Sequence, residues 1–146
     1  MKRSLLISLL LLAASAAPAP AADRELWATV NICDTESHPS EIGIRASLPA
    51  RTVQLRFRVQ YRDSADGRWR WVRGANSGWH KDRARESGWS FEVAGDGTRI
   101  LRGVVNYRWT KRGKVVRRTR LTEVGHQSTA GADPADFSAA TCRISD

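Results

Sequence analysis

Hydrophobic and polar residues alternate with a period of two along most of the chain. In the clearest run, residues 53–62, every second position is apolar and the positions between are glutamine or arginine. Such alternation is typical of a β-strand that buries one face. Similar runs over 26–33, 42–48 and 101–109 predict further strands of this kind.

Turn-forming residues separate these runs. Asp66-Gly67 predicts a hairpin from the 53–62 strand into a strand at 68–72. The segment 111–114, which contains Gly113, predicts another hairpin, leading into 115–122. For the remaining chain we expect a loop at 74–81 and strands at about 89–93 and 138–144.

Nothing after residue 22 keeps a helical period. Seven or eight short strands separated by turns predict an all-β fold, an antiparallel β-sandwich of the immunoglobulin-like or fibronectin type III-like kind. A small β-barrel is the alternative, because it produces the same alternation.

The first residues have the composition of an export signal. Lys2 and Arg3 precede an apolar stretch over 5–17, and Ala19-Pro20-Ala21 provides small residues for cleavage. The stretch is shorter than the roughly 20 residues that a membrane span needs. We therefore expect a secretory signal peptide over 1–22 and one domain over 23–146. The protein would be secreted, or periplasmic if the cell has an outer membrane.

Cys33 and Cys142 are the only cysteines. In an exported protein they predict a disulfide that joins the first strand to the last. Two free, buried thiols are the alternative.

Several of these segments resemble parts of small exported bacterial domains. They are the stretches 27–35 and 42–49, then Tyr107 and Trp109 in a late strand, and Cys142 near the end. The resemblance implies export and an immunoglobulin-like sandwich, and it implies no activity and no binding residue.

The chain is strongly basic, with 24 Lys and Arg against 15 Asp and Glu and a net charge of +9. The basic residues concentrate in 51–73 and 108–120. If these hairpins are sheet neighbours, one outer face carries a row of guanidinium groups, which match phosphate, sulfate and carboxylate. This hypothetical anion-binding face consists of Arg56, Arg58, Arg62, Arg102 and Arg108. The alternative is an ordinary solvated face.

Tryptophan and arginine alternate in 68–71. Trp69 and Trp71 should lie on one face and the two arginines on the other, so any cation–π contact must come from a neighbouring strand. We expect most of the six tryptophans in the core. Trp79, in a glycine-flanked loop, is the ring we expect to be exposed and to contact a ligand.

Other chemistry has less support. Asp34, Glu36 and His38 alternate without a second cluster, so we expect no metal and no cofactor. His80 and Asp82 lack a nucleophile motif nearby, so we expect no enzyme. The composition favours a monomeric, non-catalytic domain that binds an anionic polymer or acidic protein outside the cell. The alternatives are a small secreted hydrolase using His80 and Asp82, and a purely structural exported domain.

Overall fold

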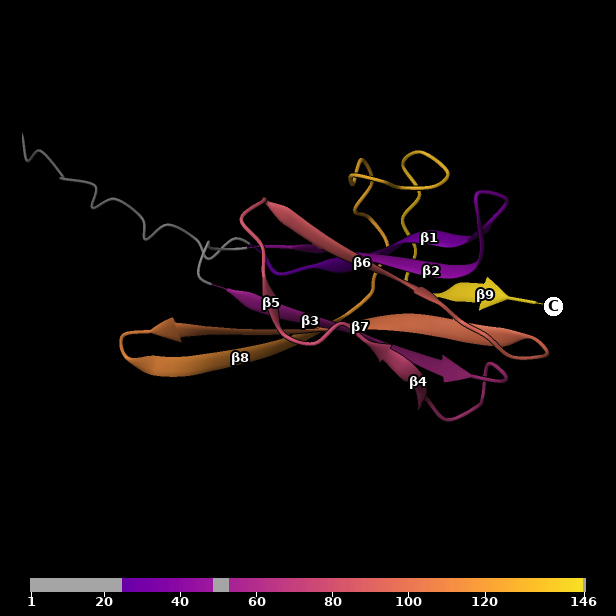
Figure 1. Cartoon of the computed structure of the whole chain (residues 1–146), viewed down its shortest axis with the longest axis horizontal. Helices are drawn as coiled ribbons and strands as arrows, with labels where there is room; N and C mark the ends of the chain where they lie inside the picture. The colour runs from indigo at the N-terminus through magenta and orange to yellow at the C-terminus, as the bar shows by residue number, and fades with distance from the viewer. Residues whose placement is uncertain (1–24, 49–52, 146) are drawn as a thin grey trace, which may run out of the picture.

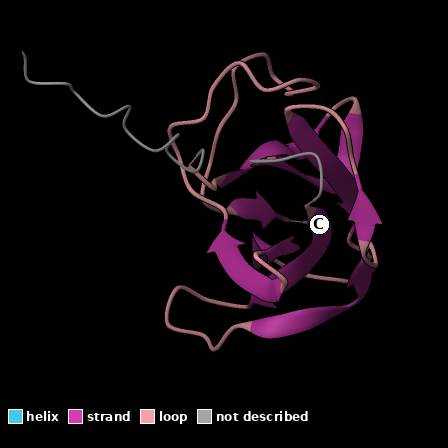
Figure 2. Cartoon of the chain, turned by 90° about the vertical axis from the view of Figure 1, so that its left-hand side faces the viewer, coloured by secondary structure: helices cyan, strands magenta, loops and turns pink. Residues whose placement is uncertain are grey.

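A computed structural model describes residues 25–48 and 53–145, and the expected signal peptide lies outside this part of the chain. The described residues form strands and loops and no helix (Figures 1 and 2). The strands are β1 (Ala28–Thr35), β2 (His38–Ser47), β3 (Gln54–Arg62), β4 (Arg70–Asn76), β5 (His80–Lys81), β6 (Glu86–Glu92), β7 (Arg99–Lys111), β8 (Lys114–Leu121) and β9 (Cys142–Ile144). No helix capable of crossing a bilayer is therefore present among them.

The strands form two sheets. The smaller has the order β1-β2-β6. The larger follows the path β4-β3-β7-β8, with β5 also paired to β3 and β9 to β7. Every strand pairing is antiparallel. The expected all-β, antiparallel architecture is confirmed.

Both sheets contribute to one hydrophobic core, as the period-two pattern requires. In β3, Leu55, Phe57 and Val59 are fully buried, while the glutamines and arginines between them are only half-buried. In β7, Val105 and Tyr107 on the inner face are also fully buried, but Ile100 and Val104 on the outer face are buried too, at 7% and 4% exposed. The alternation therefore identified the inner faces of the two central strands of the larger sheet.

Strand β1 departs from the expected alternation because it is buried on both faces. Thr29 and Asn31, expected to face solvent, are 0% and 3% exposed. The segment 126–139 lies against them: Thr29 Oγ1 and Ser138 Oγ are 2.8 Å apart, and Val30 exchanges two backbone hydrogen bonds with Ala139. This covering segment lacks an alternating pattern, so the sequence did not predict it.

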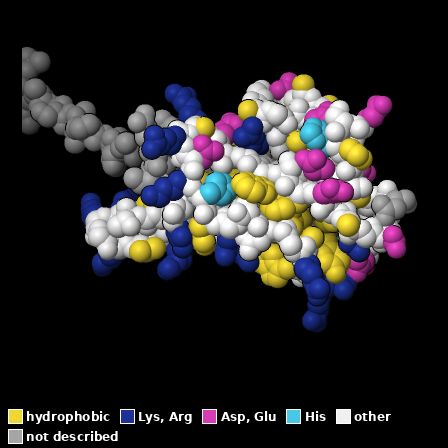
Figure 3. Space-filling view, viewed as in Figure 1, with side chains coloured by type: hydrophobic (Ala, Val, Ile, Leu, Met, Phe, Trp, Pro, Cys, Tyr) yellow, Lys and Arg dark blue, Asp and Glu magenta, His cyan; other side chains and the backbone are white. Residues whose placement is uncertain are grey.

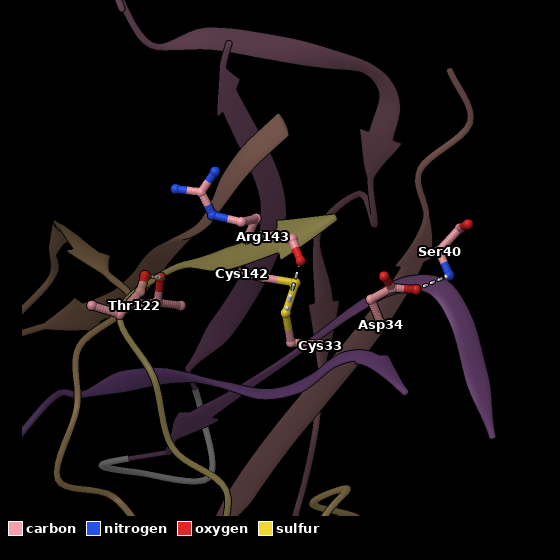
Figure 4. The surroundings of a disulfide bond; sticks show 7 residues. Cys33, Asp34, Ser40, Thr122, Cys142 and Arg143 are labelled. Atoms are coloured by element: carbon pink, nitrogen blue, oxygen red, sulfur yellow. Dashed lines mark hydrogen bonds between the residues drawn. A yellow bond between two sulfur atoms is a disulfide. The ribbon is translucent and has the colours of Figure 1, made fainter. Parts of the chain in front are cut away.

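The predicted disulfide is present between Cys33 in β1 and Cys142 in β9, 109 residues apart (Figure 4). It joins the smaller sheet to the larger one. Close to it, Asp34 Oδ1 accepts a hydrogen bond from the Ser40 backbone amide, which fixes the turn from β1 into β2.

Some element boundaries differ from the prediction. The expected loop at 74–81 includes the end of β4 and the short β5, and the last strand covers only 142–144. Nine strands are described where seven or eight were expected. The predicted hairpin into β8 is confirmed: Arg112 and Gly113 have φ angles of 50° and 74° and form a two-residue loop of the I′ kind.

Candidate functional site: an arginine and tryptophan face

The five arginines singled out by the sequence lie together on the outer face of the larger sheet. Strands β3 and β7 are neighbours, and their register sets Gln54 opposite Arg108, Arg56 opposite Asn106 and Gln60 opposite Arg102. Residues directly opposite each other share a face, so the arginines of the two strands meet there. The expected juxtaposition is therefore present.

Three tryptophan rings from the segment after β3 cover these arginines. Arg58 lies 3.9 Å from the centre of the Trp71 ring. Arg62 and Arg102 lie 4.6 and 4.1 Å from Trp69. Arg56 and Arg108 lie 4.8 and 4.2 Å from Trp79. We call this set the tryptophan–arginine ladder: Arg56, Arg58, Arg62, Arg102, Arg108, Trp69, Trp71 and Trp79.

All these stacking contacts join residues of different elements, as the alternation in 68–71 required. Each is a cation–π interaction, worth about 0.5–1 kcal/mol at an exposed site and about 2 kcal/mol when desolvated. Several such contacts hold the guanidinium groups in place, so the ladder is an ordered surface.

Amide side chains hold three of these arginines further. Arg56 Nη2 donates to Asn106 Oδ1 at 3.3 Å. Arg102 Nε donates to Gln60 Oε1 at 2.9 Å, and Arg108 Nε donates to Gln54 Oε1 at 2.6 Å. The three arginines of β3 differ from these two at Nε. Their Nε atoms are buried and have no hydrogen-bond partner among the described residues; these arginines are Arg56, Arg58 and Arg62. The ladder thus contains donors that the described protein leaves unsatisfied.

The positive charges of the ladder lie close together. Burial, and then the charge of Arg56, lower the pKa of Arg58. Burial, and then Arg62, lower that of Arg102. Arginine nevertheless stays protonated at physiological pH because its ordinary pKa is so high. The face is therefore permanently cationic, and its charges repel one another.

Charge also separates the two sheets. The strands β3, β7 and β8 carry three, four and four basic residues and no acidic one. The strands β1, β2 and β6 carry four acidic residues and a single arginine. In Figure 3 the basic side chains gather towards the β7–β8 end, and most acidic ones lie on the other half of this view. The larger sheet thus carries most of the positive charge of these strands.

The expectation that most tryptophans lie in the core is wrong. None of the six is fully buried; Trp71 and Trp89 are 47% and 43% exposed, and the other four are half-buried. The rings of the ladder pack on guanidinium groups outside the core. Trp79 is half-buried against Arg56 and Arg108, so it is not the most exposed ring. Its contact with a ligand stays a prediction.

The residues of the enzymatic alternative form a structural cluster. His80 stacks on Phe57 at 5.7 Å, and its Nε2 lies 3.5 Å from Ser87 Oγ. Ser87 is only 2% exposed, which is unsuited to a nucleophile that a substrate must reach. Hydrogen bonds, chiefly from the Ala84 backbone amide, lower the pKa of Asp82. Asp82 therefore acts as an ionised cap of its own turn.

Asp34, Glu36 and His38 do not form a metal site. Asp34 accepts from Ser40, and His38 Nδ1 lies 3.1 Å from Glu41 Oε2. No cluster of three or more histidine, cysteine or acidic residues able to hold a metal occurs in 25–48 and 53–145.

The sequence identified the arginines of the ladder but assigned Trp69 and Trp71 to the wrong environment. Alternation shows that two rings share a face, but it does not show whether that face is the inner or the outer one. The useful signal was the arginine at alternate positions of β3, which marks the same face as solvated. No protein-family model matches the chain, and comparison with curated proteins and with solved structures returned no match.

Proposed function

We propose that the protein is an exported, monomeric, non-catalytic domain that binds an anionic polymer on the tryptophan–arginine ladder. The observation that carries the proposal is the gathering of five arginines on strands that contain no acidic residue. Stacking on tryptophan leaves the edge of a guanidinium, with its N–H donors, available to an oxyanion.

The energetics of the free protein support this proposal. Five like charges on one face repel one another. A polymer with regularly spaced negative groups would offset this repulsion. Residues two apart on a strand are about 6.6–6.8 Å apart, so Arg56 and Arg58 offer a repeat of that length.

The topology supports an immunoglobulin-like or fibronectin type III-like classification as part of the same proposal. The chain crosses between sheets from β2 to β3, from β5 to β6 and from β6 to β7. Such crossings produce the Greek-key connections of these sandwiches. The Cys33–Cys142 disulfide supports export, since disulfides persist in oxidising compartments.

Retention on a heparin-type resin tests the proposed function. The wild-type protein should bind at low salt and elute as salt rises, because binding releases counterions. The variant R58Q/R102Q should elute at clearly lower salt. The variant R83Q/R85Q removes the same charge from the β5–β6 connection and should elute close to the wild type.

A lysine variant separates charge from geometry. R58K/R102K keeps the charge and loses the planar fork, so it should elute between the wild type and R58Q/R102Q. Near-ultraviolet circular dichroism should verify that each variant is folded. Absence of retention at low salt, or equal elution of the two glutamine variants, would contradict the proposal.

A further inference from the structure

One end of the ladder opens into a depression of about 310 Å³. Its lining includes Gln54, Lys81, Thr110 and Arg117, together with Arg108 of the ladder. None of the described residues that line it is acidic. The volume lies at the lower end of the range for ligand sites, which suits a single small group.

The register explains why these side chains meet. Lys81 on β5 is opposite Gln54 on β3, Gln54 is opposite Arg108 on β7, and Arg108 is opposite Arg117 on β8. A single row therefore crosses four strands on one face of the sheet. We call Lys81, Gln54, Arg108 and Arg117 the cationic row.

The cationic row is unfavourable in the free protein. Arg108 and Arg117 are directly opposite each other, and like charges in that position are destabilising. Neither Lys81 nor Arg117 forms an ion pair with a residue in the described part of the chain. A bound anion would convert the repulsion into attraction.

Arg108 is also held in place. Its Nε donates to Gln54 at 2.6 Å, and its guanidinium stacks on Trp79 at 4.2 Å. With Nε engaged, the two terminal nitrogens remain as the paired donors that recognise an oxyanion. This arrangement differs from Arg56, Arg58 and Arg62, whose Nε atoms have no partner.

We propose that the cationic row is a subsite for a phosphate monoester group. The inference rests on the proposed function and deepens it by naming the chemistry of the ligand. Three cations, with the amide of Gln54 and the hydroxyl of Thr110 in the same depression, match a tetrahedral group with several acceptor oxygens. A phosphate monoester carries about −1.5 to −2 at pH 7, which is closer to the charge of the row than a single carboxylate or sulfate ester.

Calorimetric titration with methyl phosphate tests this proposal, with methyl sulfate as the singly charged probe. Methyl phosphate should bind more tightly at pH 7.5 than methyl sulfate. Lowering the pH to 5 should weaken methyl phosphate about five- to tenfold, because its second pKa is near 6. Methyl sulfate binding should not weaken, because a sulfate ester keeps its single negative charge over this range.

Neighbouring residues of β8 provide a matched pair of variants. R117Q removes a member of the cationic row and should weaken methyl phosphate by about tenfold or more. R118Q removes the same charge from the next position, opposite Tyr107 on the other side of the strand, and should change binding less than twofold. K81Q should resemble R117Q, and it tests the row from another strand.

Two results would overturn the subsite: equal weakening by R117Q and R118Q, or equal and pH-independent affinity for methyl phosphate and methyl sulfate. The resin experiment uses Arg58 and Arg102, which do not line the depression. Absence of resin retention by the wild-type protein, with methyl phosphate binding present, would therefore overturn the proposed function alone. Resin retention of the wild-type protein without methyl phosphate binding would overturn the subsite alone.

Discussion

Tyr107 is among the largest side chains that the core buries completely. Its hydroxyl donates a 2.9 Å hydrogen bond to the carbonyl of Trp27, just before β1, and so ties the two sheets together. Burial raises the pKa of the phenol well above its ordinary value of 10, because a charged phenolate is poorly solvated in the core. The hydroxyl therefore stays protonated and keeps its bond to Trp27.

Tyr107→Phe should lower the free energy of unfolding by about 1 kcal/mol at pH 7, the usual worth of such a hydrogen bond. Because the pKa is raised in the folded state, the unfolded chain loses its proton first. The contribution of Tyr107 to wild-type stability should therefore be constant below about pH 10 and fall above it. Urea unfolding at pH 7 to 11 would show this loss in the wild type and in Tyr61→Phe, and not in Tyr107→Phe. Parallel curves for all three proteins would contradict the argument.

The ladder shows the limit of sequence reasoning for single residues. Alternate arginines on β3 indicated its outer face, and the exclusion of stacking within 68–71 indicated partners on another strand. The burial of Trp69 and Trp71 was predicted wrongly, because a large apolar ring is ordinarily assigned to a core. Here the two rings are partly shielded from water by the guanidinium groups on which they stack, outside the core.

At the scale of elements, the sequence predicted the strand faces that pack into the core between the two sheets. It predicted β3 well because that strand has one inner and one outer face. It predicted the inner face of β7, but not the burial of Ile100 and Val104 on the outer face. It missed the double burial of β1, since the covering segment 126–139 is irregular. The sequence could not predict the cationic row either, because the row depends on the register of four strands and on the two-residue β5.

The β7–β8 hairpin extends past β3 in Figure 1, and in the described part of the chain the strand pairing of residues 109–116 lies within the hairpin itself. Its loop contains Arg112 at a φ of 50°, a left-handed conformation that costs most residues roughly 1–2 kcal/mol. Asparagine tolerates this conformation better, and Asn-Gly is the preferred pair in such loops.

Arg112→Asn should therefore slow amide hydrogen exchange at the tip of the hairpin about two- to fivefold, which corresponds to about 0.5–1 kcal/mol. Exchange measured by NMR at Lys111 and Lys114 would test this. Arg118→Asn removes the same charge from an extended position and should not slow exchange. A decrease of protection in Arg112→Asn would contradict the assignment of strain to this loop.

At the scale of the whole molecule, the disulfide closes almost the entire described chain. A loop of this length contributes about 4–5 kcal/mol in the chain-entropy model, because it restricts the unfolded state. Cys33 lies in the smaller sheet and Cys142 in the larger, so the bond also limits their separation.

Cys33→Ala/Cys142→Ala should lower the free energy of unfolding by up to about 4–5 kcal/mol, with the strand content unchanged. Urea unfolding followed by tryptophan fluorescence would measure the loss. Wild-type protein treated with reductant is the control and should approach the variant. A loss under 1 kcal/mol would show that the core alone determines stability.

The unequal charge of the two sheets also acts before any contact is made. It gives the molecule an electric dipole that runs from the acidic layer to the basic one. If the ladder binds a polyanion as proposed, the torque on this dipole would turn the arginine-bearing layer forward, and more encounters would begin in the binding orientation. This orientation would raise the association rate. The electrostatic interaction behind it decays over about 10 Å in 0.1 M salt.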